Sequence, residues 1–251
     1  PGNTTGSSDR DLVAAWSPDG TRILMASAKD GTSRVWEVSN ALITGANSGE
    51  LLLTFSEHIP FSASWSPDGT RIATSDQNNE FGSAKIWDAA TGEVMLDLFP
   101  EDFDFGVSAV AWSPDGTRIV TFSADGLGRI WDAMTGEELM VFTGVSSAAG
   151  PVIEWSPSGN RILTAGEGGE VKVWDANTGR ELLNLPFRGF SISASWSPGG
   201  DHIAVSDYDG NLRIYPVWQS TQELVDYAKD CCVIRELTPE ERQQFGLPPQ
   251  P

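Results

Sequence analysis

Short apolar segments, each bounded by turn residues, recur along most of the chain. In the first unit, small and apolar residues alternate over Val13–Trp16, and further apolar runs cover Arg22–Ala26 and Ser33–Trp36. Pro18-Asp19-Gly20 separates the first two runs, and Asp30-Gly31 separates the second from the third. Pro presets a turn, Gly tolerates a positive φ, and Asp-Gly is a strong hairpin signal. The pattern therefore predicts antiparallel strands joined by tight hairpins.

The same unit occurs five times. The segment Trp16–Ile23 recurs letter for letter as Trp65–Ile72 and Trp112–Ile119, with looser copies at Trp155–Ile162 and Trp196–Ile203. A second aromatic follows each leading tryptophan by about 20 residues. These second aromatics are Trp36, Trp87, Trp131, Trp174 and Tyr215, and an aspartate follows three of them, at Asp88, Asp132 and Asp175. A segment that recurs at regular intervals in this way indicates one supersecondary unit per repeat.

A fourth apolar segment completes four of the five units. It follows Thr-Gly-Glu or Thr-Gly-Arg in the middle units, and we expect fourth strands over 51–55, 94–98, 138–142 and 181–185. The fifth unit runs from Asn211 to Val217 and then meets a polar helix start at Gln219–Glu223. We therefore expect a polar lead over 1–10, repeats over 11–218 (about 11–55, 56–98, 99–142, 143–185 and 186–218), and a tail of two short helices over 219–251.

Units of this length, with four strands and a Trp-Asp near the end of the third, are typical of propeller blades. Over roughly Val13–Val217 the chain resembles the WD-repeat (WD40) β-propeller family. The resemblance implies an all-β fold with five recognisable four-stranded blades and a short helical C-terminal tail. The tail segment Arg235–Arg242 resembles the tails of bacterial WD-repeat proteins, which predicts the C-terminal part of a larger bacterial signalling protein.

Two departures from the family pattern affect the interpretation. Family blades often carry a Gly-His pair whose histidine joins a buried network, but His58 and His202 are the only histidines, and neither follows a glycine. The other network positions are partly present, so we expect the blades to be held mostly by apolar contacts. These positions are Asp30, Asp125 and Asp209, with Ser27, Ser123 and Ser206 just before them.

The second departure is the number of units, because most relatives have seven blades. We expect the chain to be part of a larger ring, with about two blades supplied by an upstream segment or by another chain. The open strand edges of such a piece would template pairing with other chains. The alternative is a five-bladed ring closed by a segment such as Cys232–Leu237.

Charge and cysteine content bear on the possible partners of the protein and on its location. Acidic residues outnumber Lys and Arg by 35 to 16, for a net charge of −19. Because nucleic-acid binding relies on neutralising phosphates with Lys and Arg, we expect no nucleic-acid partner and no anionic membrane surface. The residues 1–10 contain no apolar segment, and the two cysteines, Cys231 and Cys232, are neighbours without a disulfide framework. Both observations predict a reducing, cytoplasmic location.

The sequence lacks recognisable catalytic and cofactor-binding motifs. It contains no phosphate-binding loop, no nucleophile elbow and no metal-ligand spacing, and we expect no cofactor, no metal and no catalytic residue. Asp102 with Asp104, or His58 beside Ser56 and Glu57, could support acid–base chemistry. In a chain with 35 acidic residues, we interpret them as solvated loop charges.

The family resemblance also suggests where a partner binds. It implies a face built from the loops that join fourth to first strands and second to third strands. Aromatic residues in such loops are natural anchors, and neighbouring charges set complementarity. The candidate contacts are Glu57, His58, Phe61, Asp102, Phe103, Asp104, Phe105, Phe187, Arg188 and Phe190.

These observations predict a non-catalytic scaffold or ligand-sensing module that binds a protein or peptide, with a basic partner suiting the acidic, aromatic loop at 101–105. Two other functions stay open. One is a structural subunit that assembles through open propeller edges. The other is a propeller hydrolase, which would need convergent acids and a base near the central channel.

Overall fold

The computed structural model describes residues 13–27, 31–38, 49–55, 60–76, 82–98, 106–143, 152–166, 170–186, 191–207 and 209–218. These residues form nineteen strands and no helix. The predicted lead at 1–10 and the helical tail at 219–251 lie outside the described residues. Among the described residues there is no helix long and apolar enough to cross a membrane.

The strands form five separate antiparallel sheets. Sheet 1 contains β1 (Val13–Trp16), β2 (Arg22–Ser27), β3 (Thr32–Glu37) and β4 (Glu50–Phe55); sheet 2 contains β5 (Pro60–Trp65), β6 (Arg71–Asp76), β7 (Ala84–Asp88) and β8 (Val94–Leu98). Sheet 3 contains β9 (Val107–Trp112), β10 (Arg118–Ser123), β11 (Leu127–Asp132) and β12 (Glu138–Thr143). Sheet 4 contains β13 (Val152–Trp155), β14 (Arg161–Ala165), β15 (Glu170–Asp175) and β16 (Glu181–Pro186), and sheet 5 contains β17 (Ser191–Trp196), β18 (His202–Asp207) and β19 (Leu212–Pro216).

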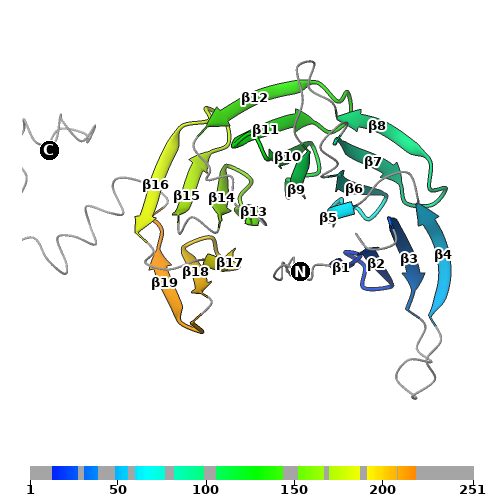
Figure 1. Ribbon diagram of the computed structural model, residues 1–251, viewed down its shortest axis with the longest axis horizontal. Helices are drawn as coiled ribbons and strands as arrows, with labels where there is room; N and C mark the ends of the chain where they lie inside the picture. The colour runs from blue at the N-terminus through cyan, green and yellow to red at the C-terminus, as the bar shows by residue number, and fades with distance from the viewer. Residues whose placement is uncertain are drawn as a thin grey trace, which may run out of the picture.

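Each sheet is a meander in which consecutive strands pair. The predicted first, second and third strands and the four fourth strands are therefore confirmed. Within the described residues sheet 5 contains three strands, which agrees with the sequence pattern, where only four units show a fourth strand. Figure 1 shows the sheets arranged radially, with their first strands towards the centre, as an incomplete ring from sheet 1 to sheet 5.

The Ser-Pro-Asp-Gly-Thr turn explains why the first two strands of each unit form a hairpin. The Ser66 hydroxyl donates to Asp68 Oδ1 at 2.6 Å and accepts the Arg71 backbone N–H at 2.9 Å. Gly69 has φ of +69° and donates its N–H to the Ser66 carbonyl oxygen. A positive φ is strained for other residues, so this glycine is required by the turn. The same bonds recur around Gly20 and Gly116.

A second turn joins the third and fourth strands, and there the aspartate of Trp-Asp is a turn cap. Asp88 Oδ1 accepts the backbone N–H groups of Ala90 and Thr91, each at 2.8 Å. Gly92, with φ of +77°, donates its N–H to the Asp88 carbonyl oxygen. Asp132 and Asp175 cap the corresponding turns of sheets 3 and 4 in the same way.

The core lies between neighbouring sheets, with one apolar cluster at each of four joints. At the first joint, Leu24 and Val35 of sheet 1 pack with Trp65 and Ile72 of sheet 2, and all four side chains are buried. The remaining joints repeat this arrangement from sheet 2 to sheet 5. Because burial of apolar side chains is the main favourable term in folding, each sheet depends on its neighbour for stability.

An arginine crosses each of the first three joints. Arg71, the first residue of β6, donates to the carbonyl oxygens of Ala133 (2.7 Å) and Gly116 (3.2 Å) in sheet 3. Its guanidinium carbon lies 4.6 Å from the centre of the Trp112 ring. Arg22 and Arg118 make the same contacts with sheets 2 and 4, respectively. At the fourth joint Arg161 donates to the Trp218 carbonyl oxygen at 2.9 Å. We call the contact that Arg22, Arg71 and Arg118 each make with the next sheet the arginine–tryptophan joint.

Candidate functional site

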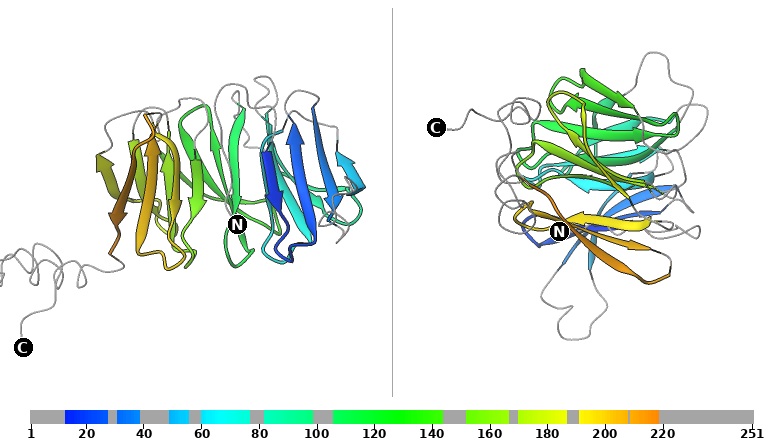
Figure 2. Two further views of the ribbon diagram at one scale, coloured as in Figure 1. Left: turned by 90° about the horizontal axis from the view of Figure 1, so that it is seen from below. Right: turned by 90° about the vertical axis from the view of Figure 1, so that its left-hand side faces the viewer.

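The strand order gives the ring two chemically different rims. At one rim lie the turns between first and second strands and between third and fourth strands, which we call the turn rim. At the other rim lie the connections between second and third strands and between successive sheets, which we call the loop rim. Figure 2 shows the strands running from one rim to the other. Phe61, the one candidate partner contact within the described residues, lies near the start of β5 at the loop rim.

Charged side chains of the turn rim are bonded to the framework. The Ser17 hydroxyl, followed by the backbone N–H of Thr21, lowers the pKa of Asp19 from 3.8 to about 2. The corresponding serine hydroxyls, Ser66 and Ser113, lower the pKa values of Asp68 and Asp115. Hydrogen bonds to the charged form stabilise it, so these carboxylates stay ionised and hold their turns. Their role at this rim is structural.

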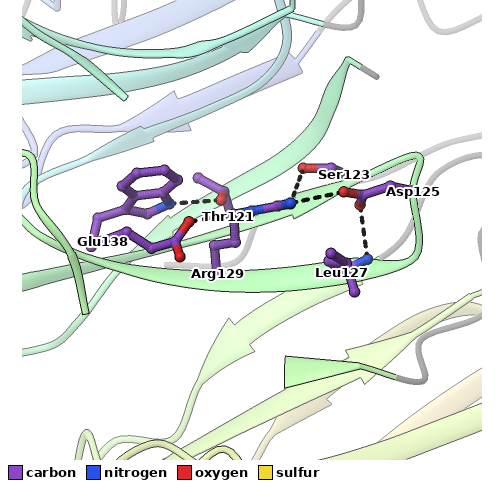
Figure 3. A network of polar contacts seen from close by, with 7 residues as sticks. Thr121, Ser123, Asp125, Leu127, Arg129 and Glu138 are labelled. Atoms are coloured by element: carbon purple, nitrogen blue, oxygen red, sulfur yellow. Dashed lines mark hydrogen bonds and ion pairs between the residues drawn. The ribbon is translucent and has the colours of Figure 1, made fainter. Parts of the chain in front are cut away.

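The loop rim of sheet 3 carries a polar network around a buried arginine (Figure 3). Arg129 donates to Asp125 Oδ2 at 2.9 Å and to the Ser123 hydroxyl at 3.3 Å, and its Nε lies 3.5 Å from Glu138 Oε2. Asp125 also accepts the Leu127 backbone N–H at 2.9 Å, which closes the turn between β10 and β11. Arg129 thus gives the Asp125 carboxylate a cationic partner within its own sheet.

The tryptophan of the third strand is bonded to a threonine that the sequence reasoning missed. Trp131 Nε1 donates to Thr121 Oγ1 at 2.8 Å, whereas Ser123, the expected network member, bonds to Arg129. The same bond joins Trp87 to Thr74 and Trp174 to Thr164. The available signal was the spacing Arg-Ile-x-Thr, which occurs only in the three middle units. The middle sheets therefore combine apolar packing with a partial polar network.

Sheets 1 and 5 differ from this arrangement. In sheet 1, Met25 stands where the middle sheets have threonine, and the buried Nε1 of Trp36 has no hydrogen-bond partner among the described residues. In sheet 5, the buried Asp207 accepts the backbone and side-chain N–H groups of Asn211. Asp209, which the repeat pattern aligned with Asp125, is exposed, so the pattern placed the turn carboxylate of this sheet two residues too late.

One of the ten candidate contacts lies within the described residues. Phe61 is half-buried in β5, at a β-bulge where the pairing shifts between Pro60 and Ser62. Bulges re-aim side chains and are common near functional sites. The other nine candidates lie outside the described residues, so their roles stay predictions: Glu57, His58, Asp102, Phe103, Asp104, Phe105, Phe187, Arg188 and Phe190.

A partly buried carboxylate lies at the joint of sheets 4 and 5. Glu154 in β13 accepts the Trp196 backbone N–H at 3.2 Å and the Ser195 hydroxyl at 3.4 Å. Burial raises the pKa of Glu154 above its usual 4.5, and these hydrogen bonds offset only part of that effect. In the described ranges, no group of three His, Cys, Asp or Glu side chains is arranged to hold a metal ion. We assign Glu154 to the joint.

Radial four-stranded meanders repeated around a centre define a β-propeller architecture. The family model for the WD domain, G-beta repeat, matches residues 4–37, 49–88, 99–132, 136–175 and 187–216. The chain therefore belongs to the WD-repeat family, whose members generally act as scaffolds for protein–protein interaction. A search of curated proteins found no match.

Proposed function

We propose that this protein is a non-catalytic scaffold that binds a protein or peptide partner at its loop rim. The observation that supports this function most directly is the bonded frame of the turn rim. On the turn rim, the repeated Asp and Arg side chains are bonded to the framework in sheet after sheet. A rigid, internally bonded frame is well suited to present the loops of the opposite rim to a partner.

The chemistry of the loop rim supports a basic partner with aromatic or apolar residues. Phe61 lies at a bulge of this rim, and the loop at 101–105 alternates acidic and aromatic residues. The chain carries a net charge of −19, which attracts cationic partners and steers their approach. Within this proposal the protein is a bacterial, cytoplasmic signalling component.

The test is selection from a displayed peptide library that contains both basic and acidic members, followed by fluorescence anisotropy on the recovered sequences. We expect basic peptides with aromatic residues, whose affinity falls about tenfold or more in Phe61→Ala and in the double variant Asp102→Asn, Asp104→Asn. Asp115→Asn is the matched control, because it removes a carboxylate from the turn rim. Its affinity for the peptides should stay unchanged.

Two results would contradict the proposal. The first is binding that all loop-rim substitutions leave intact. The second is turnover in a hydrolase screen, run with and without divalent metals, that Asp102→Asn or His58→Ala abolishes. The second result would favour a propeller hydrolase instead.

A further inference from the structure

The tryptophan that ends each first strand reports whether a sheet precedes it in the ring. Trp65, Trp112, Trp155 and Trp196 are 5–7% exposed, because each packs against the sheet before it. Trp16, the corresponding residue of sheet 1, is 50% exposed. An exposed tryptophan of this kind is unusual in a protein whose other copies bury the same residue.

The other residues on the same face of sheet 1 as Trp16 are also more exposed than their counterparts in the other sheets. Ala14 is exposed, although its counterparts Ala63, Val110, Ile153 and Ala194 are all buried. Ile23 and Trp36 are half-buried, whereas every counterpart of Ile23 has no exposed surface. We call this surface, made of Ala14, Trp16, Ile23 and Trp36, the leading face of sheet 1.

The leading face also carries the acceptors that the arginine–tryptophan joint uses. At the first joint, Arg22 stacks on Trp65 and donates to the carbonyl oxygens of Gly69 and Ala89. Sheet 1 has the matching backbone. Gly20 has φ of +70° and repeats the turn of Gly69, and Val38 donates to the Thr21 carbonyl oxygen as Ala89 donates to that of Thr70. The receiving half of a joint is therefore already formed in sheet 1.

We propose that the leading face of sheet 1 binds a further WD-type sheet whose second strand begins with an arginine. That arginine would stack on Trp16 and donate to the carbonyl oxygens of Gly20 and Val38. The sheet would cover Trp16 and Ile23 with the apolar side chains of its second and third strands, as Leu24 and Val35 cover Trp65. A cation over an indole face, with two directed hydrogen bonds, gives this contact specificity as well as area.

A second copy of the chain does not supply this arginine. The face that sheet 5 would offer carries His202 in the arginine position, with its Nδ1 3.1 Å from Asp201 Oδ1. Leu212 and Ile214 on the same face are 65% and 64% exposed, so apolar surface is present there. Imidazole is shorter than the arginine side chain and cannot donate to both carbonyl oxygens from one fork. The arginine requirement therefore distinguishes a WD-type sheet from self-association.

The test uses the full chain with a duplicate of residues 56–98 fused ahead of Pro1. The duplicate carries a copy of Arg71, and the matched control replaces only that copied arginine with glutamine. Hydroxyl-radical footprinting with mass spectrometry measures the oxidation rate of each tryptophan. Trp65, Trp112, Trp155 and Trp196 serve as internal references in the same molecule. The copied Trp87 reports whether the added sheet folds.

With the arginine present, we expect oxidation of Trp16 to fall about sevenfold, the ratio of the exposed fractions 50% and 7%. With glutamine, Trp16 should stay reactive. Equal protection by arginine and glutamine would overturn the arginine requirement. A reactive Trp16 beside an arginine-bearing sheet that has folded, with its copied Trp87 protected, would overturn the docking itself. An added sheet that stays unfolded, with its copied Trp87 reactive, would overturn it too, because docking on sheet 1 should stabilise that sheet. A dimer of the unfused chain by light scattering, with Trp16 already as protected as Trp65, would instead identify a second copy as the occupant.

Discussion

The guanidinium group of Arg71 in sheet 2 lies over the indole ring of Trp112 in sheet 3, 4.6 Å from the ring centre. The same side chain donates to two backbone carbonyl oxygens of sheet 3. One residue thus links the hairpin of one sheet to two turns of the next. The repeat of this contact at Arg22 and Arg118 makes it a component of the framework.

Arg71→Gln should lower the free energy of unfolding by roughly 2 kcal/mol, because it removes directed hydrogen bonds and a cation–π contact. Arg71→Lys keeps the positive charge but loses the two-pronged hydrogen bonding of the guanidinium group. Its free energy of unfolding should lie between those of the parent protein and Arg71→Gln. Urea denaturation measures both. Arg180→Gln changes an exposed arginine of a turn and should stay within about 0.5 kcal/mol of the parent protein. Equal effects at Arg71 and Arg180 would show that the joint adds no stability.

Thr74→Val should destabilise the protein by about 1–3 kcal/mol, because it leaves the buried Nε1 of Trp87 without its acceptor. The reciprocal change, Met25→Thr, offers the unbonded Nε1 of Trp36 an acceptor at the corresponding position. We expect it to raise stability by about 1 kcal/mol. Thermal denaturation of the two variants checks both signs. A loss of stability in Met25→Thr would mean that the apolar contacts of Met25 outweigh the hydrogen bond.

Gly128→Ala should be destabilising, because an added Cβ would overlap the ring of Phe142 on the paired strand. Overpacking of this kind typically costs about 1–3 kcal/mol. Sheet 2 shows the compatible pair, with Ala84 opposite Leu98. The double variant Gly128→Ala, Phe142→Leu should therefore recover part of the loss in the same denaturation experiment. Additive losses from the two substitutions would contradict this steric explanation.

Asp19 should stabilise the protein near neutral pH and make that stability fall in acid. Its pKa is lowered from 3.8 to about 2 by the Ser17 hydroxyl and the Thr21 N–H. A folded-state pKa below the unfolded value contributes stability above pH 3.8, and that contribution is lost as the pH falls towards 2. Asp19→Asn should therefore be less stable than the parent at pH 5 and equal to it near pH 2. Asp209→Asn, a change at an exposed aspartate of sheet 5, is the control for lost surface charge.

Glu154 should have the opposite pH dependence. Burial raises its pKa above 4.5, so the folded protein holds this proton more tightly than the unfolded chain does. Stability is then lost as the pH rises from the unfolded pKa through the raised value. Glu154→Gln keeps an acceptor for the Trp196 N–H and carries no charge. We expect its unfolding free energy at pH 7 to equal or exceed that of the parent, and a clear loss would contradict this.

The sequence predicted the strands well because their signals are local. Apolar alternation and turn residues such as Gly69 and Gly92 specify a hairpin without reference to distant residues. The joints were harder, since the partners of Arg71 lie in another repeat, 45 and 62 residues away. An arginine that recurs at the same position of successive repeats could point into solvent or contact the next sheet. Its structural role becomes visible only when neighbouring sheets are placed together.

The candidate partner contacts were predicted from loop position and residue type, and neither property determines a side chain's surroundings. Phe61 illustrates this, because a β-bulge decides where its ring points, and the sequence gives no register shift. The exchange of roles between Ser123 and Thr121 has the same origin. Strand pairing places Thr121 beside the indole of Trp131, whereas simple proximity to Asp125 favoured Ser123.

The most direct test of this account is the oxidation rate of the five first-strand tryptophans in the unmodified chain, measured by hydroxyl-radical footprinting. The incomplete ring predicts that Trp16 reacts about seven times faster than Trp65 and Trp112, following exposed fractions of 50% and 7%. Trp155 and Trp196 should match the protected pair. Equal protection of all five tryptophans in a monomeric sample would contradict the account, because it would mean that the five sheets close into a ring on their own.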